Sequence, residues 1–203
     1  MDMHARSTIL LVLITVLTVV VGCTDKTKTY RSGEYRTIDA APDRDTDTAR
    51  RYNEQGLKHL QKEELDEAAS DFRRALVADV TFGPAHNNLG KVYYAQKDWY
   101  QAAWEFDYAR ELMPRQPEPL NNLGLVHEQA GELDRAIEHY EQAVALGRDR
   151  IEFRANLARA KVRRGDTDDE LIVLLQQILD EDKRPEWLVW ARPHLLRLQA
   201  RPR

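Results

Sequence analysis

Residues 83–116 read GPAHNNLGKVYYAQKDWYQAAWEFDYARELMPRQ, and the spacing of their small and aromatic side chains continues on both sides. One column of glycines falls at intervals of 34 residues: Gly56, Gly90 and Gly124. The same interval relates two alanine columns and an aromatic column: Ala68, Ala102, Ala136; Ala75, Ala109, Ala143; Phe72, Phe106, Tyr140. Four columns in one register predict an internal repeat.

Each column has a packing role in a pair of helices. The glycine of the first helix and the first alanine of the second helix let the two helices approach closely. The aromatic side chain fills the groove between them, and the last alanine lets the next hairpin close down. Each unit therefore buries its apolar face only by stacking on its neighbours, which predicts an all-α solenoid of helical hairpins.

This pattern resembles the tetratricopeptide repeat family, whose 34-residue unit carries the same order of small, small, aromatic and small residues. Three units match, 49–82, 83–116 and 117–150, and the middle one matches best. The resemblance implies a right-handed superhelical solenoid of helix-turn-helix hairpins. Gln55 and Val80 depart from the pattern, so we expect a looser first helix in the first unit.

The same frame extends to a degenerate fourth unit at 151–184, for which we expect a hairpin that turns at Gly165-Asp166. Glu170 and Gln177 replace two of its small residues, so the packing of its second helix is in doubt.

Residues 185–203 hold several large apolar side chains, and a solenoid needs an atypical terminal helix over its last repeat. We expect a C-terminal capping helix that Pro193 kinks or divides. The alternative is that Trp187 and Trp190 form a partner site.

The N-terminal region predicts export. An apolar or hydroxyl-bearing run of 13 residues, Ile9–Val21, is too short for a membrane-spanning helix, which needs about 20 residues, and has the length of a signal-peptide core. Residues 20–23 resemble the lipobox of bacterial lipoproteins, which implies removal of residues 1–22 and lipidation of Cys23. The alternative is a secretory signal or uncleaved anchor with an incidental cysteine.

Residues 23–48 comprise the expected lipidated cysteine and a polar segment without helical or strand periodicity, which we interpret as a flexible tether. The alternative is that Tyr30, Tyr35 and Ile38 dock on the first hairpin. Thr24 favours sorting to the outer membrane, with the repeats facing the periplasm of the cell envelope.

Composition and spacing argue against other classes of function. The net charge is −4, and no basic block supports nucleic-acid binding. His127-Glu128 lacks the second histidine of a zinc-protease helix. One complete hairpin separates His59 from His127, so these two residues are too far apart to share a metal. We expect no catalytic residue, no cofactor and no metal.

The resemblance implies a concave groove lined by the first helix of each unit, and asparagine recurs at its fifth and sixth positions. An asparagine side chain has donors and an acceptor, so a row of them can bind the backbone of an extended peptide. The alternative is that these residues bind only their own structure. The groove candidates are Asn53, Asn87, Asn88, Lys91, Tyr94, Asn121, Asn122, Glu128, Gln129, Asn156 and Arg159.

One subclass of these repeats grips a C-terminal carboxylate with Lys and Arg on the third unit. Glu118 and Asn122 occupy those positions here, which argues against that mode.

A second candidate surface comes from comparing the repeats with one another. Tyr100, Trp104 and Tyr108 are spaced by four residues and share one helix face, whereas the equivalent positions of the first and third units are polar. Exposed aromatic clusters mark interfaces. The alternative is that the tether or neighbouring side chains cover them.

Together these features predict a membrane-anchored adaptor or scaffold for a protein or peptide partner in the bacterial envelope. The resemblance includes lipoproteins that assist pilus or secretion assembly and others that recruit cell-wall enzymes. The alternative is a structural protein that self-assembles into a homo-oligomer.

Overall fold

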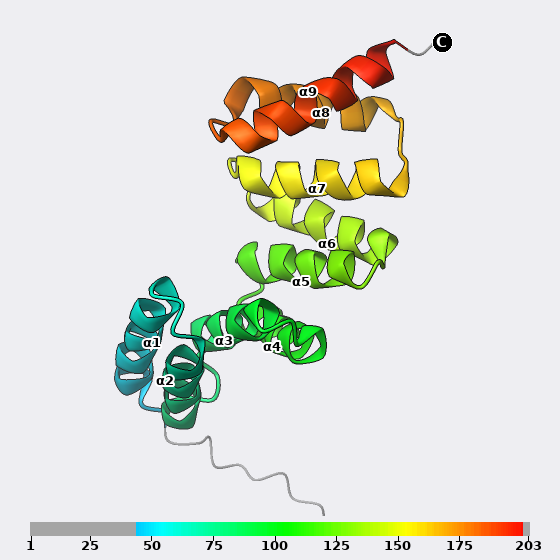
Figure 1. Ribbon diagram of the computed structural model, residues 1–203. Coiled ribbons are helices and arrows are strands. Elements are labelled where there is room, and N and C mark those ends of the chain that lie inside the picture. The colour runs from blue at the N-terminus through cyan, green and yellow to red at the C-terminus, as the bar shows by residue number, and fades with distance from the viewer. Residues whose placement is uncertain (1–43, 201–203) are drawn as a thin grey trace, which may run out of the picture. The chain divides into compact units, whose positions relative to one another are not determined.

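The computed structural model describes residues 44–200, and this part of the chain folds into nine α-helices without a β-strand (Figure 1). The helices are α1 Thr46–Gln61, α2 Leu65–Ala78, α3 Gly83–Ala95, α4 Trp99–Leu112, α5 Glu118–Gln129, α6 Leu133–Leu146, α7 Ile151–Arg164, α8 Asp169–Glu181 and α9 Pro185–Gln199. Each helix packs on the next in sequence, and α1, α3, α5 and α7 also contact one another in series. The all-α stack of hairpins is thus confirmed. The expected signal peptide, Cys23 and nearly all of the tether lie outside the described residues.

Local sequence signals set the helix starts. Asp45, Asp98 and Asp168 act as N-caps, because each carboxylate accepts a hydrogen bond from the backbone N–H three residues on. Proline stands in the first turn of α3, α5 and α9, where its missing N–H has no helical partner to lose.

The repeated columns meet inside each hairpin. A Cβ atom placed on Gly56, Gly90 or Gly124 would lie 2.6, 2.6 or 2.5 Å from the aromatic ring of the same unit. No real Cβ contact is that short, so only glycine lets the ring lie flat on the first helix. The rings of Phe72, Phe106 and Tyr140 are almost completely buried. The predicted packing of small residues against an aromatic residue is confirmed.

The turn inside each hairpin places one residue in the left-handed backbone region. These residues are Glu63, Lys97, Gly131 and Gly165, with φ of 62°, 64°, 78° and 96°. They are 34 residues apart, so the turn conformation repeats with the fold although the residue type does not. Residues other than glycine are strained there.

The fourth hairpin turns at Gly165 and buries a leucine-rich face on α8, formed by Leu171, Leu174, Leu175 and Ile178. Glu170, which replaces a small residue, lies exposed and accepts a hydrogen bond of 2.6 Å from the buried Lys161 ammonium. In the first hairpin, α1 runs unbroken through the exposed Gln55, so the helix forms in spite of that departure from the pattern.

Helix α9 packs on α8 and contributes Ala191 and Leu195 to the core cluster of α6, α7 and α8. Pro193 does not divide it, because the helix runs from Pro185 to Gln199. Because proline has no backbone N–H, the Val189 carbonyl receives no hydrogen bond from Pro193. Both residues are exposed, so water can bind that carbonyl. Among residues 44–200 no helix combines the length and apolar character that a membrane crossing requires.

Candidate peptide-binding groove

A ladder of asparagine side chains joins the first helices of successive hairpins. Asn88 Nδ2 donates to Asn53 Oδ1 at 2.9 Å. In the same way, Asn122 donates to Asn87 at 2.9 Å, and Asn156 donates to Asn121 at 2.8 Å. The sixth-position asparagine of each unit therefore bonds to the fifth-position asparagine of the unit before it, which fixes the register between α1, α3, α5 and α7.

The ladder leaves one row of amide groups available. Asn53, Asn87 and Asn121 use their Oδ1 atoms as acceptors, and no hydrogen bond within residues 44–200 occupies their Nδ2 donors. The three residues are largely buried, with exposed fractions of 7%, 7% and 8%, but their nitrogens are not completely enclosed. The structure therefore assigns sixth-position asparagines to the fold itself, and it leaves a donor at each fifth position.

A buried carboxylate holds the middle of the groove together. Glu128 on α5 is 1% exposed and accepts bonds of 2.8 and 2.7 Å from Arg159 on α7. It also accepts 2.9 Å from Arg163 and 2.8 Å from the Tyr140 hydroxyl. Burial alone would raise the pKa of Glu128, but the bonds and charge of Arg159, together with Arg163 and Tyr140, hold it below its ordinary value. Glu128 is thus an ionised anchor for two arginines.

Lys91 and Tyr94 extend the groove along α3. Lys91 Nζ lies 3.3 Å from Asn88 Oδ1, and no carboxylate of the described residues lies within 4.0 Å of it. Burial of this ammonium group lowers its pKa, and Glu118 opposes the shift. Tyr94 packs edge-on against Trp99 at 5.0 Å, and burial raises the pKa of its hydroxyl. Helix α5 contacts both α3 and α7, so Tyr94 on α3 and Arg159 on α7 lie on either side of it.

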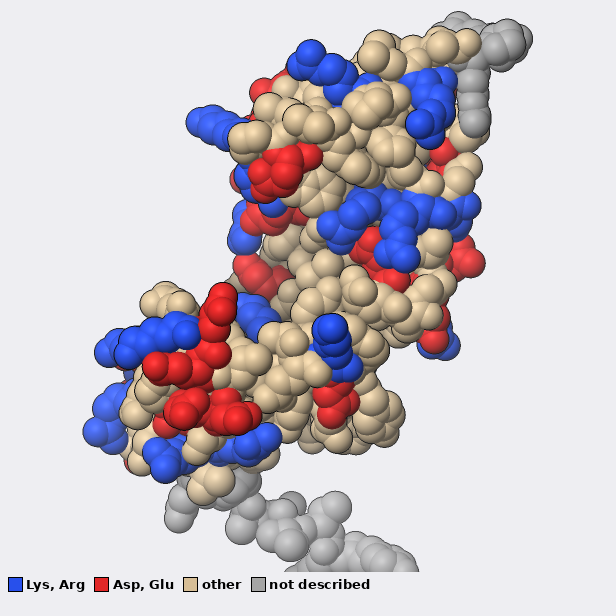
Figure 2. Space-filling view, viewed as in Figure 1, with Lys and Arg blue, Asp and Glu red and all other residues tan. Residues whose placement is uncertain are grey.

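Cations dominate the surface of α7. Figure 2 shows Lys and Arg side chains gathered over the C-terminal half of α7, with acidic side chains directly below them. The sequence pattern identified Glu128 and Arg159 as neighbours of the groove, but it gave no sign of Arg163. One feature of the sequence could have pointed to this polar cluster. The aromatic column has tyrosine at position 140 where the first two units have phenylalanine, and a buried hydroxyl needs a hydrogen-bond partner.

The aromatic surface formed by Tyr100, Trp104 and Tyr108 lies on α4, away from the ladder. Their exposed fractions are 75%, 58% and 43%, and Trp104 stacks on Tyr108 at 6.3 Å. Tyr108 in turn packs on the buried His86 at 5.0 Å. No described residue covers these rings.

His86, which the sequence did not single out, anchors this surface. Its Nδ1 lies 2.7 Å from Glu105 and its Nε2 lies 2.9 Å from the Val80 carbonyl. Burial would lower the pKa of His86, but the bonds to Glu105 and Val80 raise it above its ordinary value.

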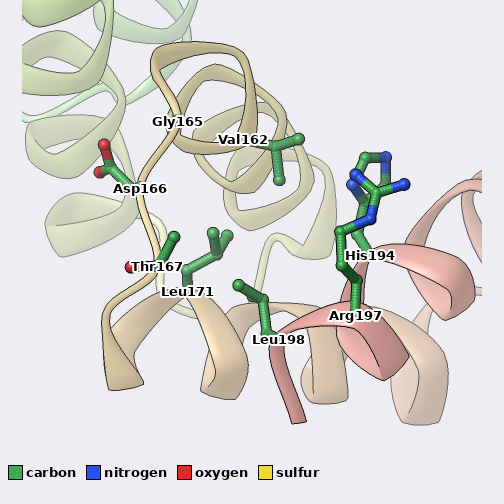
Figure 3. Close-up of a pocket in the computed structure, with 8 residues that line it drawn as sticks. All are labelled: Val162, Gly165, Asp166, Thr167, Leu171, His194, Arg197 and Leu198. Atoms are coloured by element: carbon green, nitrogen blue, oxygen red, sulfur yellow. The ribbon is translucent and has the colours of Figure 1, made fainter. Parts of the chain in front are cut away.

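Two other polar sites lie elsewhere. His127 and His139 stack with ring centroids 5.1 Å apart, and burial lowers the pKa of His139. A cavity of about 110 Å³ lies between the α7–α8 turn and α9, where Figure 3 shows Leu171 and Leu198 facing each other and His194 and Arg197 together at one side. Within residues 44–200 no group of three or more His, Cys, Asp or Glu side chains could hold a metal.

Comparison with known proteins agrees with this geometry. The tetratricopeptide repeat family profile matches twice, at residues 53–117 and 117–149. Anaphase-promoting complex subunit 3 of Schizosaccharomyces pombe is 27% identical over 125 residues, which make up 62% of this chain and 19% of that protein. The chain thus matches about a fifth of the length of this relative.

Solved structures share the fold. The first TPR domain of Spaghetti (RPAP3), bound to an HSP90 peptide, has a TM-score of 0.59 and 19% identity, covering 62% of this chain and 99% of that one. YrrB, a TPR protein with an unusual peptide-binding site, has a TM-score of 0.59 and 18% identity, covering 73% of this chain and 79% of that one. A thermophilic TPR protein of Thermus thermophilus has a TM-score of 0.62 and 21% identity, covering 73% of this chain and 81% of that one.

The repeat register, the packing of the columns and these matches agree on one architecture. Residues 53–149 are tetratricopeptide repeats, and the described part of the chain is an all-α superhelix of that type.

Proposed function

We propose that this protein is a membrane-anchored adaptor that binds an extended segment of a partner protein in the groove of α1, α3, α5 and α7. The observation that carries the proposal is the row of unoccupied amide donors on Asn53, Asn87 and Asn121. The function is binding without catalysis, and it requires no cofactor.

The ladder suits this function because it orients the donors before any partner arrives. Each fifth-position amide is held through its oxygen by the next repeat, so little side-chain entropy remains to be lost on binding. Backbone carbonyls of an extended segment are acceptors whatever its sequence, so a row of fixed donors binds main chain. The two peptide-binding proteins among the similar structures, the Spaghetti domain and YrrB, support the choice of a peptide as the ligand.

Site-specific photocrosslinking in cells tests the groove. A photoreactive residue at the exposed Gln129 of α5 should give partner adducts, and one at the exposed Gln176 of α8, outside the groove, should not. The double variant Asn87→Asp/Asn121→Asp keeps the oxygens that accept from Asn122 and Asn156, removes the free donors and adds one negative charge at each position. It should abolish the adducts.

The matched control for that variant is Gln176→Glu, which makes the same amide-to-carboxylate change outside the groove. Equal adducts from both crosslinker positions, or adducts that the double variant leaves unchanged, would show that the groove is not the binding site.

We also propose that acyl chains on Cys23 hold the protein at the outer membrane, with the repeats in the periplasm. Two or three acyl chains anchor a protein firmly, because each buried methylene contributes about 0.8 kcal/mol. The partners would belong to pilus or secretion assembly or to cell-wall metabolism. Cys23→Ser should abolish labelling by radioactive palmitate and release the protein from the membrane fraction. Unchanged labelling would refute the lipidation.

Self-association is a second candidate function, which the exposure of Tyr100, Trp104 and Tyr108 favours. Rigid, exposed aromatic side chains are common anchors of interfaces. If this surface joins copies of the chain, light scattering should show a mass that rises with concentration, and Trp104→Ala should return it to the monomer. A concentration-independent monomeric mass would exclude self-assembly.

A further inference from the structure

A cavity of about 210 Å³ lies between α7 and α9, and its walls are Arg159, one of the groove candidates, with Glu186, Trp187 and Trp190. The two indole rings are 5.4 Å apart and nearly perpendicular, at 82°, so they form two walls of an aromatic corner. The cavity is open to solvent on one side, and its volume leaves room for a single apolar side chain.

Trp187 is held in place by one arginine on α7 and one that precedes α9. The guanidinium groups of Arg159 and Arg184 each lie 5.3 Å from its ring. Glu128 fixes Arg159, and Asp182, whose side chain is 1% exposed, accepts a bond of 2.9 Å from Arg184. The wall is therefore rigid, as in the aromatic anchors of binding sites. Because two cations already occupy the surroundings of Trp187, a neutral apolar group fits this corner better than a third cation.

The arginine cluster beside the cavity carries more positive than negative charge, and Glu186 adds one carboxylate to the cavity wall. Arg159 and Arg163 share the single carboxylate of Glu128, which leaves one positive charge in excess. Further along the groove, Lys91 has only an amide oxygen beside it. Lys91 and Tyr94 lie one turn apart on α3, and α3 contacts α5, which contacts α7. Lys91, the α7 arginines and the cavity therefore lie on successive first helices of the stack.

We propose that the segment bound in the groove is an acidic one with an apolar side chain that enters the Trp187–Trp190 cavity, while a carboxylate lies against Lys91. This inference rests on the proposed function and specifies the chemistry of its partner. Helix α9 would then have two roles. It covers the last hairpin, and its tryptophans select the apolar side chain of the bound segment.

Selection from a library of random linear peptides displayed on phage, with the full chain held in detergent micelles as bait, tests the proposal. The enriched peptides should combine Asp or Glu with a large apolar residue. In fluorescence anisotropy with a synthetic enriched peptide, Lys91→Glu and Trp187→Leu should each weaken binding at least about tenfold. Lys91→Arg should retain it, and Trp104→Ala on α4 should have no effect.

Circular dichroism separates binding defects from folding defects. Trp187→Leu keeps an apolar side chain against the core cluster of α6 to α9, and Lys91 is exposed as a residue although its ammonium group is partly desolvated, so both variants should remain helical. If Trp187→Leu does unfold, Lys91→Glu and its Arg control still decide the acidic requirement, and Glu186→Lys at the cavity rim tests the cavity.

The two proposals fail differently. Peptides that lose binding in Asn87→Asp/Asn121→Asp but share no acidic and apolar residues, and that tolerate Lys91→Glu and Trp187→Leu, would overturn this inference and leave the groove intact. Failure to enrich any peptide, or binding that no groove variant weakens, would overturn both.

Discussion

At the scale of the residue, a single hydroxyl distinguishes the third hairpin from the first two. The aromatic column reads Phe72, Phe106 and Tyr140, and the extra oxygen lies 2.8 Å from Glu128. That carboxylate would be costly to bury alone, and it is stable because two arginines and the hydroxyl satisfy it. The polar cluster therefore ties α5, α6 and α7 together and holds two arginines beside the candidate groove.

The charge on Glu128 predicts a dependence of stability on pH. The folded-state pKa lies below the ordinary value of 4.5, so its contribution is present above that pH and is lost as the pH falls through the folded-state pKa. Glu128→Gln should cost about 2–3 kcal/mol near neutral pH and progressively less below about pH 4. Urea unfolding at several pH values measures this. The exposed Glu67→Gln is the control, and a pH-independent difference would contradict the assignment.

The glycine column predicts strain on substitution. Gly90→Ala gains helix propensity of about 1 kcal/mol but brings a methyl group within 2.6 Å of Phe106, and overpacking costs about 1–3 kcal/mol. The variant should be less stable than the wild type in thermal unfolding. Phe106→Leu in the same chain should relieve part of this loss, and strictly additive effects would argue against the contact.

At the scale of the element, the hairpin turn keeps the same backbone conformation although the residue type at its left-handed position changes. Its left-handed residue is glycine in the third and fourth hairpins and Glu63 or Lys97 in the first two. The stacked helices impose the turn geometry, so the first two units accept the strain of a side chain there.

Replacing the strained residue should stabilise the hairpin. Lys97→Gly removes about 1–2 kcal/mol of left-handed strain and loses about 0.5–1 kcal/mol to the freer unfolded chain, so we expect a net gain below about 1.5 kcal/mol. Differential scanning calorimetry should show a raised midpoint. Lys97→Ala, which retains the Cβ atom, should not show it, and equal effects of both variants would point to charge instead.

At the scale of the whole molecule, the repeats are stabilised by their neighbours, and α9 closes the stack. Without α9 the part of α8 around Leu171, which faces Leu198 of α9, would meet water. Ending the chain after Lys183 should therefore increase hydrogen exchange in α7 and α8 much more than in α1 and α2. The exposed Val189→Ser should have no such effect, and uniform exchange along the chain would exclude a nearest-neighbour solenoid.

The sequence by itself determined the fold, because the recurring small and aromatic residues specify how the two helices of a hairpin pack. The Phe106 ring can pack this closely on the first helix only because residue 90 is glycine. The resemblance to tetratricopeptide repeats also predicts a groove along the first helices, where the asparagines recur. Only the tertiary structure decided how those asparagines are used. Whether Asn88 faces a ligand or Asn53 depends on the stacking of separate hairpins, which no local pattern encodes. For the same reason, the joining of Trp187 to Arg159 and Arg184, from three different elements, could not be predicted from spacing.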